Sequence, residues 1–249
     1  MQDPERNAGN FERGAFCTTR WSLISAARDS KPSGEVQEAL ETLCRAYWYP
    51  LYAYTRRSGF REHDAQDLVQ GFFEHLLRGG ALQRVSREKG KFRSFLLAAL
   101  KYYIADRRDF ENAAKRGGGK PLISLEGSDP EQRYQLEPVD QLSPRELFDR
   151  QWAMALIDQT LERLRQEACV GGREPLFHAI KDLLAGDRSG RSYAVIASDL
   201  EMTEAAVKMS VMRLRQRFRD CLREAVANTV ATHVELEEEL ASLRLALAG

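Results

Sequence analysis

The stretch RSYAVIASDLEMTEAAVKMSVMRLRQRFR, residues 191–219, decides how the chain folds. Apolar residues recur at helical spacing between Tyr193 and Leu200, which predicts a short first helix. Glu201 and Met202 interrupt this spacing, and Thr203 is a suitable N-cap for a longer second helix. The stretch therefore predicts two helices joined by a tight turn.

The second helix of this stretch is apolar on one side and basic around the other. Between Glu204 and Arg223 six cations stand against two acids, a local charge of +4. The apolar stripe, which we expect to face the first helix, consists of Val207, Val211, Leu214 and Phe218. The alternative is an amphipathic helix with a solvated basic face, but the short preceding helix and the capped turn favour a helix-turn-helix. Such a helix fits the DNA major groove, where its outer side meets phosphates and base edges.

A second basic segment lies at residues 87–116, where nine cations stand against four acids, a local charge of +5. It contains a predicted helix from about Phe92 to Asn112. Cations and aromatic rings on one helix suit single-stranded nucleic acid, because bases stack on the rings while the cations follow the backbone. An ordinary helix with a basic outer face and core tyrosines is an equally open alternative. The candidate contact residues are Arg93, Lys101, Tyr102, Tyr103, Arg107 and Arg108.

The rest of the chain also has helical periodicity, with no strand pattern of any length. A helix is expected to begin near Thr19, and others near 35–58, 64–77, 144–168 and 175–184. The fold class is therefore all-α: two small helical domains joined by a flexible linker, the second containing the helix-turn-helix. The expected boundaries are 15–112 for the first domain, 113–142 for the linker, 143–227 for the second domain and 228–249 for an acidic amphipathic C-terminal helix.

The C-terminal helix carries four glutamates against Arg244. Three arrangements remain open for it: packing on its own domain, pairing with a partner, or lying over a basic helix and masking it.

Composition and side-chain spacing argue against several classes of protein. The net charge is zero, so a nucleic-acid binder must segregate its cations, as this chain does. The four cysteines are scattered, which predicts buried free thiols and no zinc site or disulfide framework. No apolar run has membrane-spanning length and the N-terminus does not resemble a signal peptide, so we expect a soluble, cytoplasmic protein. Asp64 and Asp67 suit the start of a helix, and no carboxylate, His or Cys cluster suggests an enzyme, a metal or a cofactor.

Four motifs, in this order, resemble those of bacterial RNA polymerase sigma factors of the extracytoplasmic-function (ECF) type. DAQDLVQ at 64–70 is similar to the family's D-A-E-D-L-V-Q, and FRSFL at 92–96 to its F-R-x-W-L. SYAVIA at 192–197 is similar to S-Y-E-E-I-A. Ala206-Val207-Lys208, with the arginines that follow, is similar to T-V-K-S-R-L-x-R-A-R. The N-terminal segment and the acidic C-terminal helix exceed the minimal form and suggest an atypical ECF-like group.

This resemblance implies a dissociable subunit that gives core RNA polymerase promoter specificity, with promoter DNA as its second partner and an anti-sigma or other regulatory protein as a possible third. The first basic helix would hold the melted −10 strand. The residues expected to face core polymerase are Asp64, Asp67, Gln70 and Glu74. Those expected to contact −35 duplex DNA are Thr203, Glu204, Lys208, Met209, Met212, Arg213, Arg215, Gln216 and Arg217.

The chain departs from the family pattern at a few positions. Lys101-Tyr102 stands where R-N is usual, Glu201 replaces a glycine in the turn, and Ser210 replaces an arginine. The promoter sequences read by better-known members therefore do not transfer to this chain. A helix-turn-helix regulator that binds operator DNA as a dimer, with the C-terminal helix as its dimer seam, is the alternative function.

Overall fold

A computed structural model describes residues 34–78, 91–113, 129–137, 141–185, 191–230 and 232–248. The helix predicted to begin near Thr19 lies outside these residues. Helices account for the regular structure of the described part, which contains no strand, as the sequence predicts. Nine α-helices and one 3₁₀ helix occur within it: α2 (Gly34–Arg57), α3 (Glu62–Arg78), α4 (Phe92–Ala113), α5 (Pro130–Gln135), α6 (Pro144–Val170), α7 (Glu174–Ile180), η4 (Lys181–Ala185), α8 (Tyr193–Asp199), α9 (Glu204–Ala227) and α10 (His233–Ala248).

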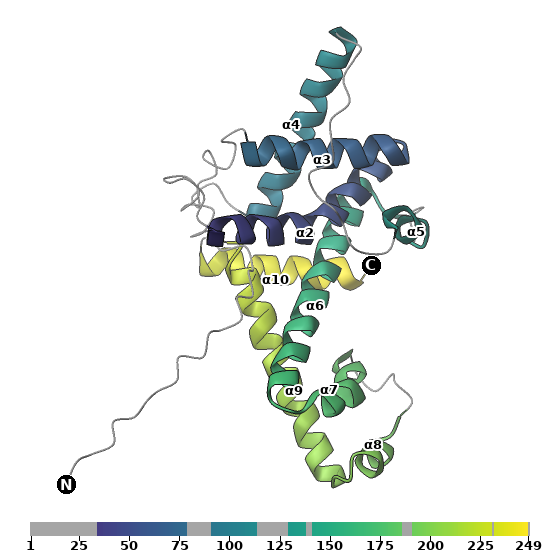
Figure 1. The fold of residues 1–249 in the computed structure, drawn as a ribbon, viewed down its shortest axis with the longest axis vertical. Coiled ribbons are helices and arrows are strands. Elements are labelled where there is room, and N and C mark those ends of the chain that lie inside the picture. The colour runs from purple at the N-terminus through teal and green to yellow at the C-terminus, as the bar shows by residue number, and fades with distance from the viewer. Residues whose placement is uncertain are drawn as a thin grey trace, which may run out of the picture.

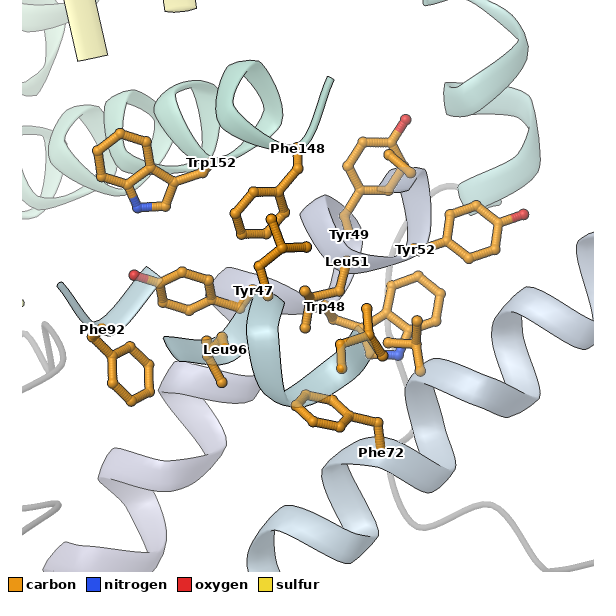
Figure 2. Packing of buried hydrophobic residues seen from close by; sticks show 14 of the residues in the cluster. Tyr47, Trp48, Tyr49, Leu51, Tyr52, Phe72, Phe92, Leu96, Phe148 and Trp152 are labelled. Carbon is orange, nitrogen blue, oxygen red and sulfur yellow. The ribbon is translucent and has the colours of Figure 1, made fainter. Parts of the chain in front are cut away.

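The largest hydrophobic core joins α2, α3 and α4 to the first half of α6 (Figure 1). Aromatic side chains fill it: Tyr47 of α2 lies near Phe148 and Trp152 of α6, whereas Trp48 and Tyr52 of α2 stack on each other, to the right in this view (Figure 2). The aromatic cluster of α2 is thus buried by a helix from the second half of the chain. The end of α9 and one side of α10 complete the same core.

Residues from both sides of the predicted 113–142 linker therefore share one core, while the division into two domains stays a prediction. Within that linker lies α5, a helix that was not predicted from the sequence. Its start carries a recognisable signal, because Asp129 accepts a hydrogen bond from Glu131 N as the N-cap and Pro130 occupies the first helical turn.

An ion pair fixes α5 to α2. The Arg56 guanidinium donates two hydrogen bonds to the Glu131 carboxylate, Nε to Oε2 at 2.8 Å and Nη2 to Oε1 at 2.6 Å. The Tyr52 hydroxyl donates a third hydrogen bond to Glu131. The hydrogen bonds from Arg56 hold the pKa of Glu131 below its usual range, against the opposing effect of burial.

Acid should therefore weaken the attachment of α5. The lowered pKa means that ionised Glu131 stabilises the folded chain above the pKa of an unfolded glutamate, and that this contribution disappears as the pH falls through the folded value. We expect Glu131→Gln to lower the free energy of unfolding by about 1.5–3 kcal/mol at neutral pH. Urea unfolding of both proteins between neutral pH and pH ~3 should show this difference shrinking towards acid. A difference that is independent of pH would contradict it.

The opposite end of the molecule is a smaller unit made by α7, η4, α8 and the first half of α9 (Figure 1). Its core contains Ile180, Leu183, Ile196, Val207 and Val211. The long helices α6 and α9 run side by side between the two ends. Leu164 of α6 and Cys221 of α9 pack together with Phe177 of α7. This arrangement carries the turn between α8 and α9 far from the large core.

The C-terminal helix α10 packs on other helices of its own chain, and its carboxylates reach Lys91 and Arg93 at the start of the basic helix α4. It contacts α6 and α9, and Leu236 and Leu243 are buried in the large core. Of the two cysteines whose side chains the structure describes, Cys221 is buried as expected, whereas Cys169 is exposed. No helix in the described ranges is both long and apolar enough to cross a bilayer.

Candidate nucleic-acid interface

Helices α8 and α9 form a two-helix unit with a capped start on each helix. The Ser192 hydroxyl accepts a hydrogen bond from Val195 N, and the Thr203 hydroxyl accepts one from Ala206 N. The predicted cap at Thr203 and the predicted start of each helix agree with this geometry, whereas the cap at Ser192 was not predicted. The turn between the helices places Glu201 at a φ of 53°, in the left-handed region where side chains other than glycine are strained.

Glycine at this position should therefore stabilise the unit. A left-handed conformation costs an L-residue about 1–2 kcal/mol, of which the greater unfolded-state freedom of glycine offsets about half. We expect Glu201→Gly to raise the free energy of unfolding by about 0.5–1 kcal/mol, and Glu201→Val to lower it because a β-branched residue fits this region worst. Both variants remove the same charge, so the difference between them in thermal unfolding reports the backbone conformation at position 201. Equal stabilities of the two variants would contradict this prediction.

The outer side of α9 is polar and exposed, with two thioether side chains at its centre. Met209 is 44% exposed and Met212 is 57% exposed, whereas Val207 and Val211 on the opposite side are buried against α8. We call the exposed set the reading face; it consists of Glu204, Lys208, Met209, Met212, Arg213 and Gln216.

Electrostatic contacts within the reading face are few. Lys208 pairs with Glu204 one helical turn away, Nζ to Oε1 at 2.7 Å, and this carboxylate raises the pKa of Lys208. The Lys208 ammonium also lies 5.7 Å from the centre of the Tyr193 ring. Arg213 is exposed and forms no ion pair with a described residue. Its guanidinium is therefore available to a ligand.

Two of the predicted DNA contacts have hydrogen-bond partners within the protein. Arg217 donates hydrogen bonds from Nε and Nη2 to the Glu167 carboxylate of α6, at 2.9 and 2.7 Å. Arg215 donates to the Leu183 carbonyl at 2.7 Å. Both arginines thus tie α9 to neighbouring helices, and Thr203 uses its hydroxyl as a cap.

A groove of about 370 Å³ opens beside this unit, between α6, α7 and α9. Its apolar residues include Leu164, Phe177 and Ile180, and Arg213 and Arg217 also line it. The thioethers of the reading face do not line the groove. The two surfaces are therefore neighbours that share Arg213.

The second candidate surface lies on α4, whose far end projects beyond α3 (Figure 1). Lys101 and Arg107 are exposed, and Tyr102 is 77% exposed, far more than is usual for an aromatic ring. Tyr103 is half-buried against α3, where its ring contacts Phe72. The side chain of Arg108 lies outside the part that the structure describes.

The two helices α3 and α4 approach closely beneath Tyr103. A Cβ atom at Gly71 would lie 2.5 Å from the Tyr103 hydroxyl oxygen, a distance that real contacts do not reach. Gly71 therefore allows the tyrosine to cross α3, and the tyrosine supports the exposed part of α4.

Arg93 differs from the other predicted contacts because it is 4% exposed. It donates hydrogen bonds to Glu239 of α10, Nε to Oε1 at 2.8 Å and Nη2 to Oε2 at 2.9 Å. A third hydrogen bond goes to Asp149 of α6, and the guanidinium stacks 4.2 Å from the centre of the Trp152 ring. Burial disfavours the charge, but the carboxylates outweigh it and raise the pKa of Arg93.

The sequence analysis gave no role to three residues around Arg93. Lys91 pairs with Glu238 and Glu239 of α10, at 3.2 and 3.3 Å. Glu239 is 0% exposed although it is charged. It lies three residues after Leu236 and four before Leu243, on the buried side of α10. An acid on an apolar stripe was the signal that the sequence offered.

The predicted polymerase-facing residues lie on the polar side of α3. Asp64 and Asp67 are exposed, whereas Gln70 and Glu74 are half-buried. The opposite side of α3 packs into the large core through Leu68, Val69, Phe72 and other apolar residues. The acidic side is thus open to a partner.

Comparisons with protein-family models, curated proteins and solved structures gave no match to this chain. Within the described ranges, no three His, Cys, Asp or Glu side chains lie together in a way that suits a metal ion. The candidate function therefore depends on the helices and their exposed side chains.

Proposed function

We propose that the chain is a promoter-specificity subunit of bacterial RNA polymerase, a sigma factor of the ECF type. The reading face of α9 carries this proposal. It combines exposed cations, an amide and two methionines on a helix whose other side is fixed against α8 through Val207 and Val211. A helix held in this way can enter the major groove while its partner supports it.

In this proposal α8 and α9 act as a helix-turn-helix on −35 duplex DNA. Lys208 and Arg213 contact phosphates and base edges, and Met209 and Met212 contact thymine methyl groups. Arg215 and Arg217 keep their structural contacts and position the helix. The DNA-contacting set is therefore smaller than the sequence alone suggested.

The exposed surface of α4 holds the −10 strand after a base has left the stack. The ring of Tyr102 provides a stacking platform, and Lys101 and Arg107 follow the phosphates. Arg93 belongs to the matching sequence motif, but its guanidinium is engaged by Glu239 in this conformation.

The acidic side of α3 docks on core polymerase, and co-purification tests this part. We expect the full chain to be retained by bacterial core RNA polymerase, and Asp64→Lys with Asp67→Lys to abolish retention. The charge-matched control is Asp158→Lys with Asp182→Lys, two exposed acids elsewhere, which should be retained normally. Specific duplex binding without retention by polymerase would instead support the operator-binding regulator.

A further inference from the structure

The start of α4 is held by carboxylates from the far end of the chain. Glu239 receives a bidentate pair of hydrogen bonds from Arg93, and it shares Lys91 with Glu238. The backbone adds one more link, because Phe92 N donates to the Thr229 carbonyl at 3.2 Å. The α10 helix thus covers Lys91 and Arg93, the two cations at the start of α4.

The local electrostatics explain why an anion is favoured at this place. The first turn of α4 contains no acidic residue, although the positive end of a helix dipole favours negative charge there. Lys91 and Arg93 add further positive charge. The α10 carboxylates supply the negative charge that the first turn of α4 lacks. A phosphate group would accept hydrogen bonds from the same donors, because a guanidinium group binds carboxylate and phosphate alike through two hydrogen bonds.

We propose that α10 is an autoinhibitory clasp: Glu238 and Glu239 occupy the place of a phosphate of the −10 strand and are displaced when single-stranded DNA binds. This inference rests on the proposed function, because it assigns a regulator to the same α4 surface. With α10 docked, Lys101, Tyr102 and Arg107 are exposed and can contact DNA. Release of α10 makes Lys91 and Arg93 available as well.

The exchange is feasible because it replaces one ion pair with another. A buried ion pair contributes little net stability, since desolvation of the two charges offsets their attraction. The apolar attachment of α10 consists of Leu236 and Leu243, which are buried, and of Leu240 and Ala246, which are partly buried, while Val234 and Leu245 remain exposed. Phosphate contacts can therefore compete with the carboxylates for Arg93.

The test compares two double variants of the full chain in binding a labelled single-stranded oligonucleotide of random sequence. Glu238→Gln with Glu239→Gln loosens the clasp. The control, Asp158→Asn with Asp182→Asn, removes the same charge from two exposed acids that pair with neither Lys91 nor Arg93 and leaves every α10 contact in place. We expect the first variant to bind about five- to tenfold more tightly than the wild type. Its slope of log affinity against log salt should stay close to that of the wild type, because both proteins make the same phosphate contacts once α10 is released. The control should match the wild type.

Hydrogen exchange of the wild-type chain gives a second, mutation-free readout. Single-stranded DNA should accelerate exchange of the amides at 233–248 as α10 is released. If DNA binds and exchange in α10 does not change, or if both double variants bind like the wild type, the clasp is refuted while the proposed function survives. Binding by none of the proteins would contradict the α4 surface itself, and the clasp with it.

Discussion

Replacing Arg93 with methionine is expected to lower the free energy of unfolding by about 3–5 kcal/mol, as for other buried ion pairs that lose one partner. Methionine is unbranched like the aliphatic part of arginine, but it leaves the Glu239 carboxylate, which is 0% exposed, without its bidentate donor. Lys91 remains 3.3 Å from Glu239 and cannot replace both hydrogen bonds. Urea unfolding followed by circular dichroism measures the loss.

A second substitution separates the buried charge from the lost packing. Adding Glu239→Leu to Arg93→Met removes both charges, and we expect the stability to return to within about 1 kcal/mol of the wild type. Asp149 tolerates the change because it is partly exposed and keeps Arg145, 3.6 Å away. The contradicting result is that Arg93→Met alone lowers the free energy of unfolding by less than about 1 kcal/mol. The Arg93–Glu239 pair would then contribute no more than an exposed ion pair, which would mean that α10 is not docked in solution.

Alanine at Arg213 should weaken binding to −35 duplex DNA by about 1–3 kcal/mol, which is about five- to 150-fold, and Lys208→Ala should have a similar effect. Both side chains are exposed, so their removal leaves the core of the two-helix unit intact. Titration of the chain, alone and bound to core polymerase, against the duplex that it enriches from a random library measures the change.

The matched control is Arg223→Ala. Arg223 lies on the same helix and is also exposed, but it pairs with Glu237 of α10 at 2.5 Å, well beyond the reading face. Arg223→Ala should leave the duplex affinity within about twofold, since a charge outside the contact surface acts mainly through its long-range electrostatic field.

Arg217→Ala should instead reduce the stability of the fold, because Glu167 loses both its hydrogen bonds from Arg217. An unchanged footprint and affinity for Lys208→Ala and Arg213→Ala would remove the reading face from the proposal.

Local patterns in the sequence predicted the helices well, because each is encoded within a few residues. Ser143 illustrates this: it forms a capping box with Glu146 at the start of α6, where the sequence placed a helix. The side of α9 that packs on α8 also followed from spacing, since Val207 and Val211 lie on one stripe. The missed α5 carried its own N-cap and proline signal at Asp129 and Pro130.

Long-range partners were beyond such reasoning. Arg93 and Glu239 are 146 positions apart, and helical spacing does not specify which helix covers which. Arg217 had the same ambiguity, because a cation beside an apolar stripe can face either solvent or a neighbouring glutamate. Three predicted DNA contacts, Arg93, Arg215 and Arg217, therefore have intramolecular partners in the structure. The surfaces left exposed are smaller and more specific than the charge pattern suggested.

Run-off transcription on genomic fragments, with core RNA polymerase and the full chain, tests the central claim most directly. The sigma-factor account predicts discrete start sites that require the chain and that disappear when Lys208 and Arg213 are both replaced by alanine. The same transcripts from core polymerase with and without the chain, together with specific duplex binding by the chain alone, would contradict it.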